Sequence, residues 1–322
     1  MDIEDRHARR DQQRRIVRRR RQAVTLIAVV AALVAAVVAL TGGSHGGSPS
    51  ARRVPQPPSA RAPSQAAGSK AGTASASAPN GHPGTEPVPI LMYHVINAPP
   101  SGAPFPGLYV SPGEFAAQMQ ALKAAGWHAV TLDQVEANWR SGAPLGPGRP
   151  LVLTFDNGYQ SQYTQALPVL QRLGWVADEN MQLSGLPPSQ GGLGQAQIRA
   201  LVAAGWELDT QGFSHADLIR LDAEQLHYEV AVARSVIQQR YHVPVNWFCY
   251  PSGHYDATVL AAVKAAGYKG STTVIPGWAH PGEDPYRLHR LRVLGGTSPG
   301  ALLAQLTSSR EAGPPPASYG GA

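Results

Sequence analysis

Titratable and polar side chains follow four short apolar segments of this chain. Carboxylates and imidazoles can transfer protons and bind cations, so these groups are the first candidates for a reactive site. His94 follows residues 88–93, and Asp156 and Asn157 follow residues 151–155. The residues that follow segments 206–208 and 245–250 in the same way are Asp209, Gln211, His215, Pro251 and Ser252. If the four segments end at one rim, these side chains meet in a single site.

The segments that carry these groups alternate with helices. A helix, a glycine, an aromatic residue and a strand recur in this order, with the aromatic residue at Trp127, Trp175, Trp206 and Tyr268. Glycine after the last apolar helical residue is a common left-handed stop. Helices and strands that alternate at this spacing predict βα units around a parallel sheet. Seven or eight such strands favour a closed or nearly closed barrel, with its reactive groups in the loops after the strands.

The N-terminal region predicts a membrane anchor. Residues 1–22 hold nine arginines and four acids and form a basic arm, and Ala23–Leu40 carries no charge. An apolar helix of that length spans roughly 27 Å, so we expect one transmembrane helix over residues 23–41, with a cleaved signal peptide as the alternative. Basic residues stay on the cytoplasmic side, which places the rest of the chain outside the plasma membrane. The chain from Pro87 on has 14 bases and 16 acids, so we expect no nucleic-acid partner.

The remaining chain divides into a linker, one folded domain and a tail. Residues 42–86 are dominated by Gly, Ser, Ala and Pro, which is typical of a disordered tether. We expect the folded domain over residues 87–310 and a flexible tail over residues 311–322. The single cysteine, Cys249, lies in an apolar run and excludes an intrachain disulfide, so we expect a buried thiol.

Four ordered motifs resemble the NodB-type polysaccharide deacetylases, in the branch that carries a Met-Tyr-His motif. They are VPILMYHVI (88–96), LTFDNGY (153–159), GWELDTQGFSHADL (205–218) and FCYPSGHYD (248–256). The flanking segment DPYRLHRLRV (284–293) agrees as well. The resemblance implies a distorted (β/α)7-type barrel that removes acetyl groups from glycans with a zinc-like divalent metal.

The resemblance also implies roles for individual residues. Asp156 is then the catalytic base and His94 the acid that protonates the leaving amine. The positions of the three metal ligands fall on Asn157, Gln211 and His215, where the family has Asp, His and His. The groove motif falls on Tyr250, Pro251 and Ser252 and lacks the family's arginine. Tyr159 is a further candidate for stacking on a sugar ring.

These substitutions predict a degenerate metal site. Amide oxygens are poor ligands for Zn²⁺ beside imidazole or carboxylate. Two unexpected acids, Asp209 and Glu179, could compensate by forming a rewired site with Asp156 and His215. The alternative is a buried hydrogen-bond network that fills the space of the lost metal.

Three functions therefore remain open. The first is a hydrolase that acts on acetylated polysaccharide or peptidoglycan at the outer face of the membrane. The second is a catalytically degenerate barrel that binds glycan or regulates another protein. The third is a metal-free hydrolase that uses Asp156 and Asp209 as paired carboxylates.

Overall fold

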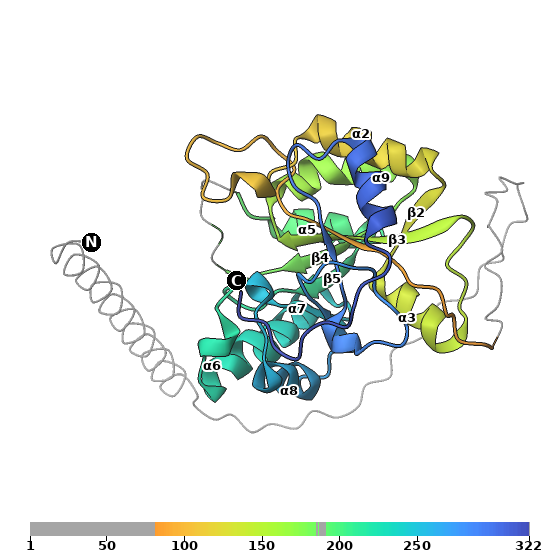
Figure 1. Cartoon of the computed structure of the whole chain (residues 1–322). Helices are drawn as coiled ribbons and strands as arrows, with labels where there is room; N and C mark the ends of the chain where they lie inside the picture. The colour runs from red at the N-terminus through yellow and green to blue at the C-terminus, as the bar shows by residue number, and fades with distance from the viewer. Residues whose placement is uncertain (1–80, 185, 187–190, 322) are drawn as a thin grey trace, which may run out of the picture. The chain divides into compact units, whose positions relative to one another are not determined.

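The computed structural model describes residues 81–184, 186 and 191–321 (Figure 1). The predicted basic arm, membrane helix and most of the linker lie outside these residues. Within the part of the chain that is described, no helix is long and apolar enough to cross a membrane.

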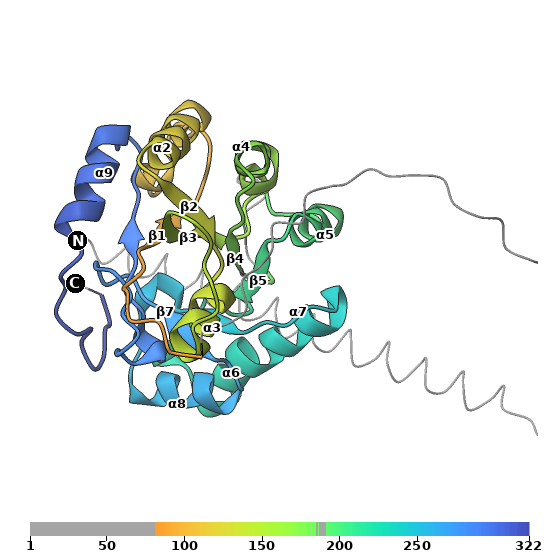
Figure 2. The same ribbon diagram turned by 90° about the vertical axis from the view of Figure 1, so that its right-hand side faces the viewer.

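The fold is built on an eight-stranded parallel sheet that curls around itself, with helices on its outer side (Figure 2). The strand order is β7-β6-β5-β4-β3-β1-β8, and β2 pairs with β3. Backbone hydrogen bonds from Thr273 to Leu288 and from Arg290 to Ile275 join the segments beside the two end strands. The strands are β1 (Ile90–Tyr93), β2 (Trp127–Val130), β3 (Arg149–Asn157), β4 (Asp178–Met181), β5 (Glu207–Thr210), β6 (Trp247–Cys249), β7 (Gly270–Thr272) and β8 (Leu291–Arg292).

The predicted helix signals are present. Ser111 forms a capping box with Glu114 at the start of one helix, and the side chains of Asp222 and Asp256 cap two others. The α-helices are α2 (Pro112–Ala124), α3 (Leu132–Ser141), α4 (Leu167–Leu173), α5 (Gln195–Ala203), α6 (Ala223–His227), α7 (Ala233–Tyr241), α8 (Ala257–Ala265) and α9 (Pro299–Ser308). The four glycines that end the predicted repeats all have positive φ; they are Gly126, Gly174, Gly205 and Gly267.

The two faces of the sheet have different chemistry. Phe155 points outward into the apolar core and stacks on Trp206 with ring centroids 5.0 Å apart. Its neighbours Thr154 and Asp156 point to the other face, where they contact a buried arginine. Because side chains alternate along a strand, β3 supplies the core with one face and the polar interior with the other.

Residues of the tail that we predicted to be flexible form hydrogen bonds with the domain. Tyr319 pairs with Tyr255 through two backbone hydrogen bonds of 2.8 Å. The Tyr255 hydroxyl donates to the carbonyl of Pro316, and His289 Nε2 lies 3.1 Å from the carbonyl oxygen of Gly313. Residues 313–319 therefore lie along the domain, because buried side chains satisfy the carbonyl groups of this Pro-rich segment.

Candidate active site at the mouth of the barrel

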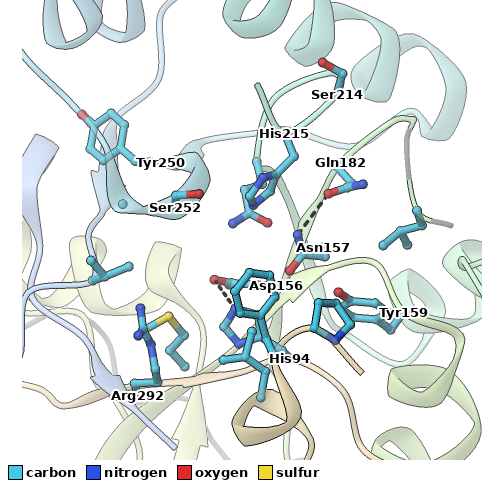
Figure 3. Close-up of a pocket in the computed structure, with 18 residues that line it drawn as sticks. His94, Asp156, Asn157, Tyr159, Gln182, Ser214, His215, Tyr250, Ser252 and Arg292 are labelled. Carbon is cyan, nitrogen blue, oxygen red and sulfur yellow. Dashed lines mark hydrogen bonds and ion pairs between the residues drawn. The ribbon is translucent and has the colours of Figure 1, made fainter. Parts of the chain in front are cut away.

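A cavity of about 570 Å³ opens at the carboxyl ends of the strands (Figure 3). It brings together most of the predicted site residues, namely His94, Asp156, Asn157, Tyr159, Gln211, His215, Tyr250 and Ser252. Asp209 and Pro251 are not among the lining residues. The positions follow from the parallel sheet, since the loops after the strands share one end of the barrel.

Asp156 is held by a buried arginine that sequence reasoning missed. Arg290 Nη1 and Nη2 donate to the two carboxylate oxygens of Asp156 at 2.8 and 2.9 Å, and Asn180 Nδ2 donates at 2.8 Å. Burial raises the pKa of Asp156, but the charges of Arg290 and His94 and these hydrogen bonds outweigh it and lower the pKa to about 2. Asp156 is therefore an oriented carboxylate at neutral pH. The signal for Arg290 was an arginine between the apolar residues Leu288 and Leu291.

His94 is a neutral imidazole at pH 7. Burial lowers its pKa to about 4, although the charge of Asp156 opposes this shift. Its Nε2 lies 3.8 Å from Asp156 Oδ2, and its Nδ1 is buried without a hydrogen-bond partner among the described residues. Such a group must take up a proton before it can donate one.

The positions that correspond to the family's metal ligands share one side of the cavity. Asn157 Nδ2 donates to Gln182 Oε1 at 3.0 Å, which orients this amide. Gln211 is only 3% exposed, and its Oε1 has no partner within the described ranges. Burial lowers the pKa of His215, so its imidazole is neutral. One imidazole and two amides do not fit a Zn²⁺ ion, for which Cys, His, Asp and Glu are the usual ligands.

A buried glutamate positions the loop that carries His215. Glu229 lies on a π-helical turn (Tyr228–Val232) and accepts hydrogen bonds from the backbone amides of Phe213 and Ser214, both at 2.8 Å. Gly212 has φ 87°, and a Cβ there would lie 3.0 Å from Glu229 Oε2. The loop therefore requires glycine at position 212 and an acid beneath it, and no local sequence pattern predicts that acid.

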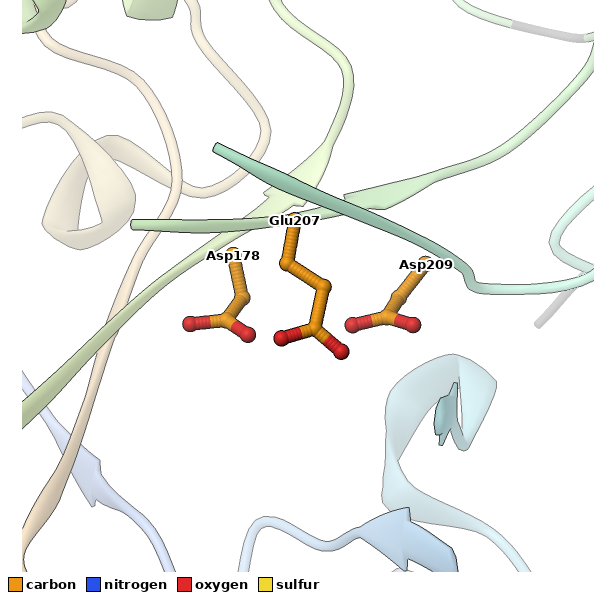
Figure 4. Close-up of side chains that lie close together, drawn as sticks. All are labelled: Asp178, Glu207 and Asp209. Atoms are coloured by element: carbon orange, nitrogen blue, oxygen red, sulfur yellow. The ribbon is translucent and has the colours of Figure 1, made fainter. Parts of the chain in front are cut away.

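Asp209, predicted as a compensating ligand, lies in a buried carboxylate cluster and does not line the cavity (Figure 4). Asp178, Glu207 and Asp209 place one oxygen each within 4.8 Å of one another. Asp178 and Glu207 begin β4 and β5, and Asp209 is in register with Asn180, which in turn is in register with Asp156. Asp209 Oδ1 accepts a hydrogen bond from the backbone amide of Trp247 at 2.9 Å.

Glu179 is fully buried, lies on the face of β4 opposite to Asn180, and does not line the cavity. Of the four residues of the predicted rewired site, only Asp156 and His215 line the cavity. The buried thiol was predicted correctly, since Cys249 is fully buried and burial raises its pKa to about 12.

Replacing Asp209 by asparagine is expected to raise the free energy of unfolding by about 1–3 kcal/mol at pH 7. Burial, then the charges of nearby acids, raise the pKa of Asp178 and Asp209 well above the usual range and that of Glu207 to about 7. Between about pH 4 and 7 these three carboxyl groups hold more protons in the folded state than in the unfolded chain. The free energy of unfolding therefore falls as pH rises through this range. Asparagine cannot ionise and keeps an oxygen for the Trp247 amide.

Urea unfolding at pH 4, 5.5 and 7 measures this effect, which should vanish at pH 4. Glu224→Gln, at an exposed acid on α6, is the control and should change stability little at any pH. A loss of stability in Asp209→Asn at pH 7, together with sensitivity of the wild type to a chelator, would show instead that the cluster holds a cation.

Comparisons with known proteins agree with the geometry of the cavity. A family model described as polysaccharide deacetylase matches residues 145–271. A putative polysaccharide deacetylase of Bacillus subtilis is 31% identical over 224 residues, which cover 69% of this chain and 77% of that protein. The structure of a Streptococcus pyogenes deacetylase in complex with acetate superposes with a TM-score of 0.63 at 26% identity, covering 69% of this chain and 99% of that one.

A shorter match concerns the chemistry of the glycan. The poly-β-1,6-N-acetyl-D-glucosamine N-deacetylase of Escherichia coli is 43% identical over 60 residues, which cover 19% of this chain and 9% of that protein. The family model covers the segments that carry Asp156, Gln211 and His215.

Proposed function

We propose that this chain, which belongs to the polysaccharide deacetylase family, hydrolyses acetyl groups on cell-surface or cell-wall glycan at the cavity at the mouth of its barrel. The observation that carries the proposal is the pairing of a neutral imidazole, His94, with the fixed carboxylate of Asp156, 3.8 Å away in a cavity of about 570 Å³. The basic residues 1–22 and the apolar segment 23–41 support a place at the outer face of the plasma membrane.

The chemistry follows from the protonation states of these two groups. Nε2 of His94 accepts a proton from water, and the resulting hydroxide attacks the acetyl carbonyl carbon. The imidazolium then returns the proton to the leaving nitrogen as the C–N bond breaks, and acetate is released. Asp156 stays ionised throughout and stabilises the imidazolium electrostatically. A metal supplies carbonyl polarisation in this family, but the donors at 157, 211 and 215 do not fit one, and no step here depends on it.

Acetate release by the full-length protein from N-acetylglucosamine polymers and peptidoglycan tests this proposal. We expect His94→Ala and Asp156→Ala to lower the rate by about 10²–10⁴-fold, because each removes part of the proton-transfer pair. The rate should rise as pH increases through about 4, where His94 loses its proton. His227→Ala, at an exposed histidine on α6, is the matched control. Undiminished release by His94→Ala would remove this residue from the reaction.

A second candidate function is a glycan-binding module without turnover. The observation that favours it is the replacement of two strong metal ligands by the amides of Asn157 and Gln211, one of which is already hydrogen-bonded to Gln182. Binding of N-acetylglucosamine oligomers without release of acetate, weakened by Tyr159→Ala, would establish this function in place of hydrolysis.

A further inference from the structure

The lining of the cavity carries one unmatched charge. Asp156 and Arg292 are its two permanently charged residues, and the charge of Asp156 is matched by the guanidinium of Arg290. Among the residues that line the cavity, Arg292 therefore carries the charge that no ion pair matches.

Arg292 is placed by the sheet to act at the mouth. It ends β8, in register with Met92 of β1, and its backbone carbonyl accepts a hydrogen bond from Gln305. Its side chain is exposed and lines the cavity (Figure 3). No acidic group among the described residues forms an ion pair with this guanidinium. The strand and its hydrogen bonds thus fix the backbone while the charged group stays available to a ligand.

The chemistry of a guanidinium selects its ligand. Its planar fork of N–H donors matches the two oxygens of a carboxylate or a phosphate, and this pairing is stronger than a hydrogen bond to a neutral group. A purely neutral acetylated glycan offers hydroxyl and amide groups alone. Phe105, which is 68% exposed at the same cavity, adds an apolar surface that suits the face of a sugar ring.

We infer that the glycan bound at this cavity is anionic, with a carboxylate or phosphate group close to the acetylated sugar, and that Arg292 is the residue that recognises it. This inference rests on the proposed function and names its substrate class. Arg292 acts here as a specificity-determining residue, because it binds an anionic substituent of the glycan. His94 and Asp156 act on the acetyl group.

The test compares three N-acetylglucosamine oligomers of equal length that are neutral, carboxylated or phosphorylated. We expect the full-length protein to bind one or both anionic oligomers about tenfold more tightly than the neutral one at low salt. The preference should shrink as salt rises, because the contact lies near solvent. The comparison of the carboxylated with the phosphorylated oligomer identifies which anionic group the protein binds.

Arg292→Gln should abolish the preference and leave the affinity for the neutral oligomer within about twofold, and Arg292→Lys should retain part of it. Arg172→Gln, at an exposed arginine on α4 outside the cavity, is the matched control and should keep the full preference. Equal wild-type affinities for the three oligomers, or an unchanged preference in Arg292→Gln, would overturn the inference. Acetate release from the neutral oligomer would still support the proposed function in that case, whereas a failure to bind any oligomer would overturn both.

Discussion

Replacing Arg290 by methionine is expected to lower the free energy of unfolding by about 3–5 kcal/mol at pH 7. The change removes two charge-assisted hydrogen bonds and leaves the Asp156 carboxylate, which is 1% exposed, as an unmatched buried charge. It also removes the donor to the carbonyl of Thr273 and to the hydroxyl of Thr154. Chemical denaturation of the wild type and the variant measures the difference.

The pH dependence distinguishes this cause from a simple loss of packing. The pKa of Asp156 is lowered to about 2, so the stability that it contributes is present above pH 3.8 and is lost as pH falls toward 2. In Arg290→Met the carboxyl group becomes protonated at a higher pH, and the deficit should therefore shrink as pH falls. Adding Asp156→Asn should restore part of the stability, because no charge then remains to be matched. A deficit that neither pH nor the second substitution reduces would contradict this explanation.

Restoring the family's ligand set is expected to raise the affinity for zinc by about three orders of magnitude or more. Asn157→Asp and Gln211→His together supply the carboxylate and the imidazole that join His215 at the cavity. Asn157 has φ 80°, which aspartate tolerates nearly as well as asparagine, so the backbone should keep its conformation. Calorimetric titration of the full-length protein measures zinc binding independently of any enzymatic activity.

Removing His215 from the restored protein provides the control. His215→Ala in that background should return the affinity to the wild-type level, because two ligands alone bind zinc weakly. Tight zinc binding by the unaltered protein, lost on Gln211→Leu, would instead show that the amide donors suffice.

The fold could be predicted from the sequence because its signals are local. Gly126, Gly174, Gly205 and Gly267 each end a helix within a few residues of the strand that follows. The same pattern predicted where the strands end, and most of the predicted site residues follow these strand ends and line the cavity. Regular alternation of helices and strands leaves few ways to arrange a parallel sheet, so short-range patterns carried this information.

The interactions inside the barrel could not be predicted in the same way. Arg290 and Asp156 are 134 residues apart, and nothing beside either residue indicates the other. Asp209 lies in β5 and Gln211 two residues later, directly after the strand, yet Gln211 lines the cavity and Asp209 belongs to the carboxylate cluster. Whether a polar residue faces a mouth or a buried interior depends on register and depth, which spacing along the sequence does not give.

The association of the last residues with the domain has a practical consequence for recombinant work. A protein truncated at residue 310 would lose Tyr319, which pairs with the backbone of Tyr255, and Pro316, which accepts the hydrogen bond of the Tyr255 hydroxyl. Tyr255 itself lies shortly after the turn that contains Ser252. The truncation would also remove the contact between the His289 imidazole and the carbonyl oxygen of Gly313. Affinity tags are therefore better placed upstream of residue 81 than downstream of Tyr319, where they would lie beside the segment that pairs with Tyr255.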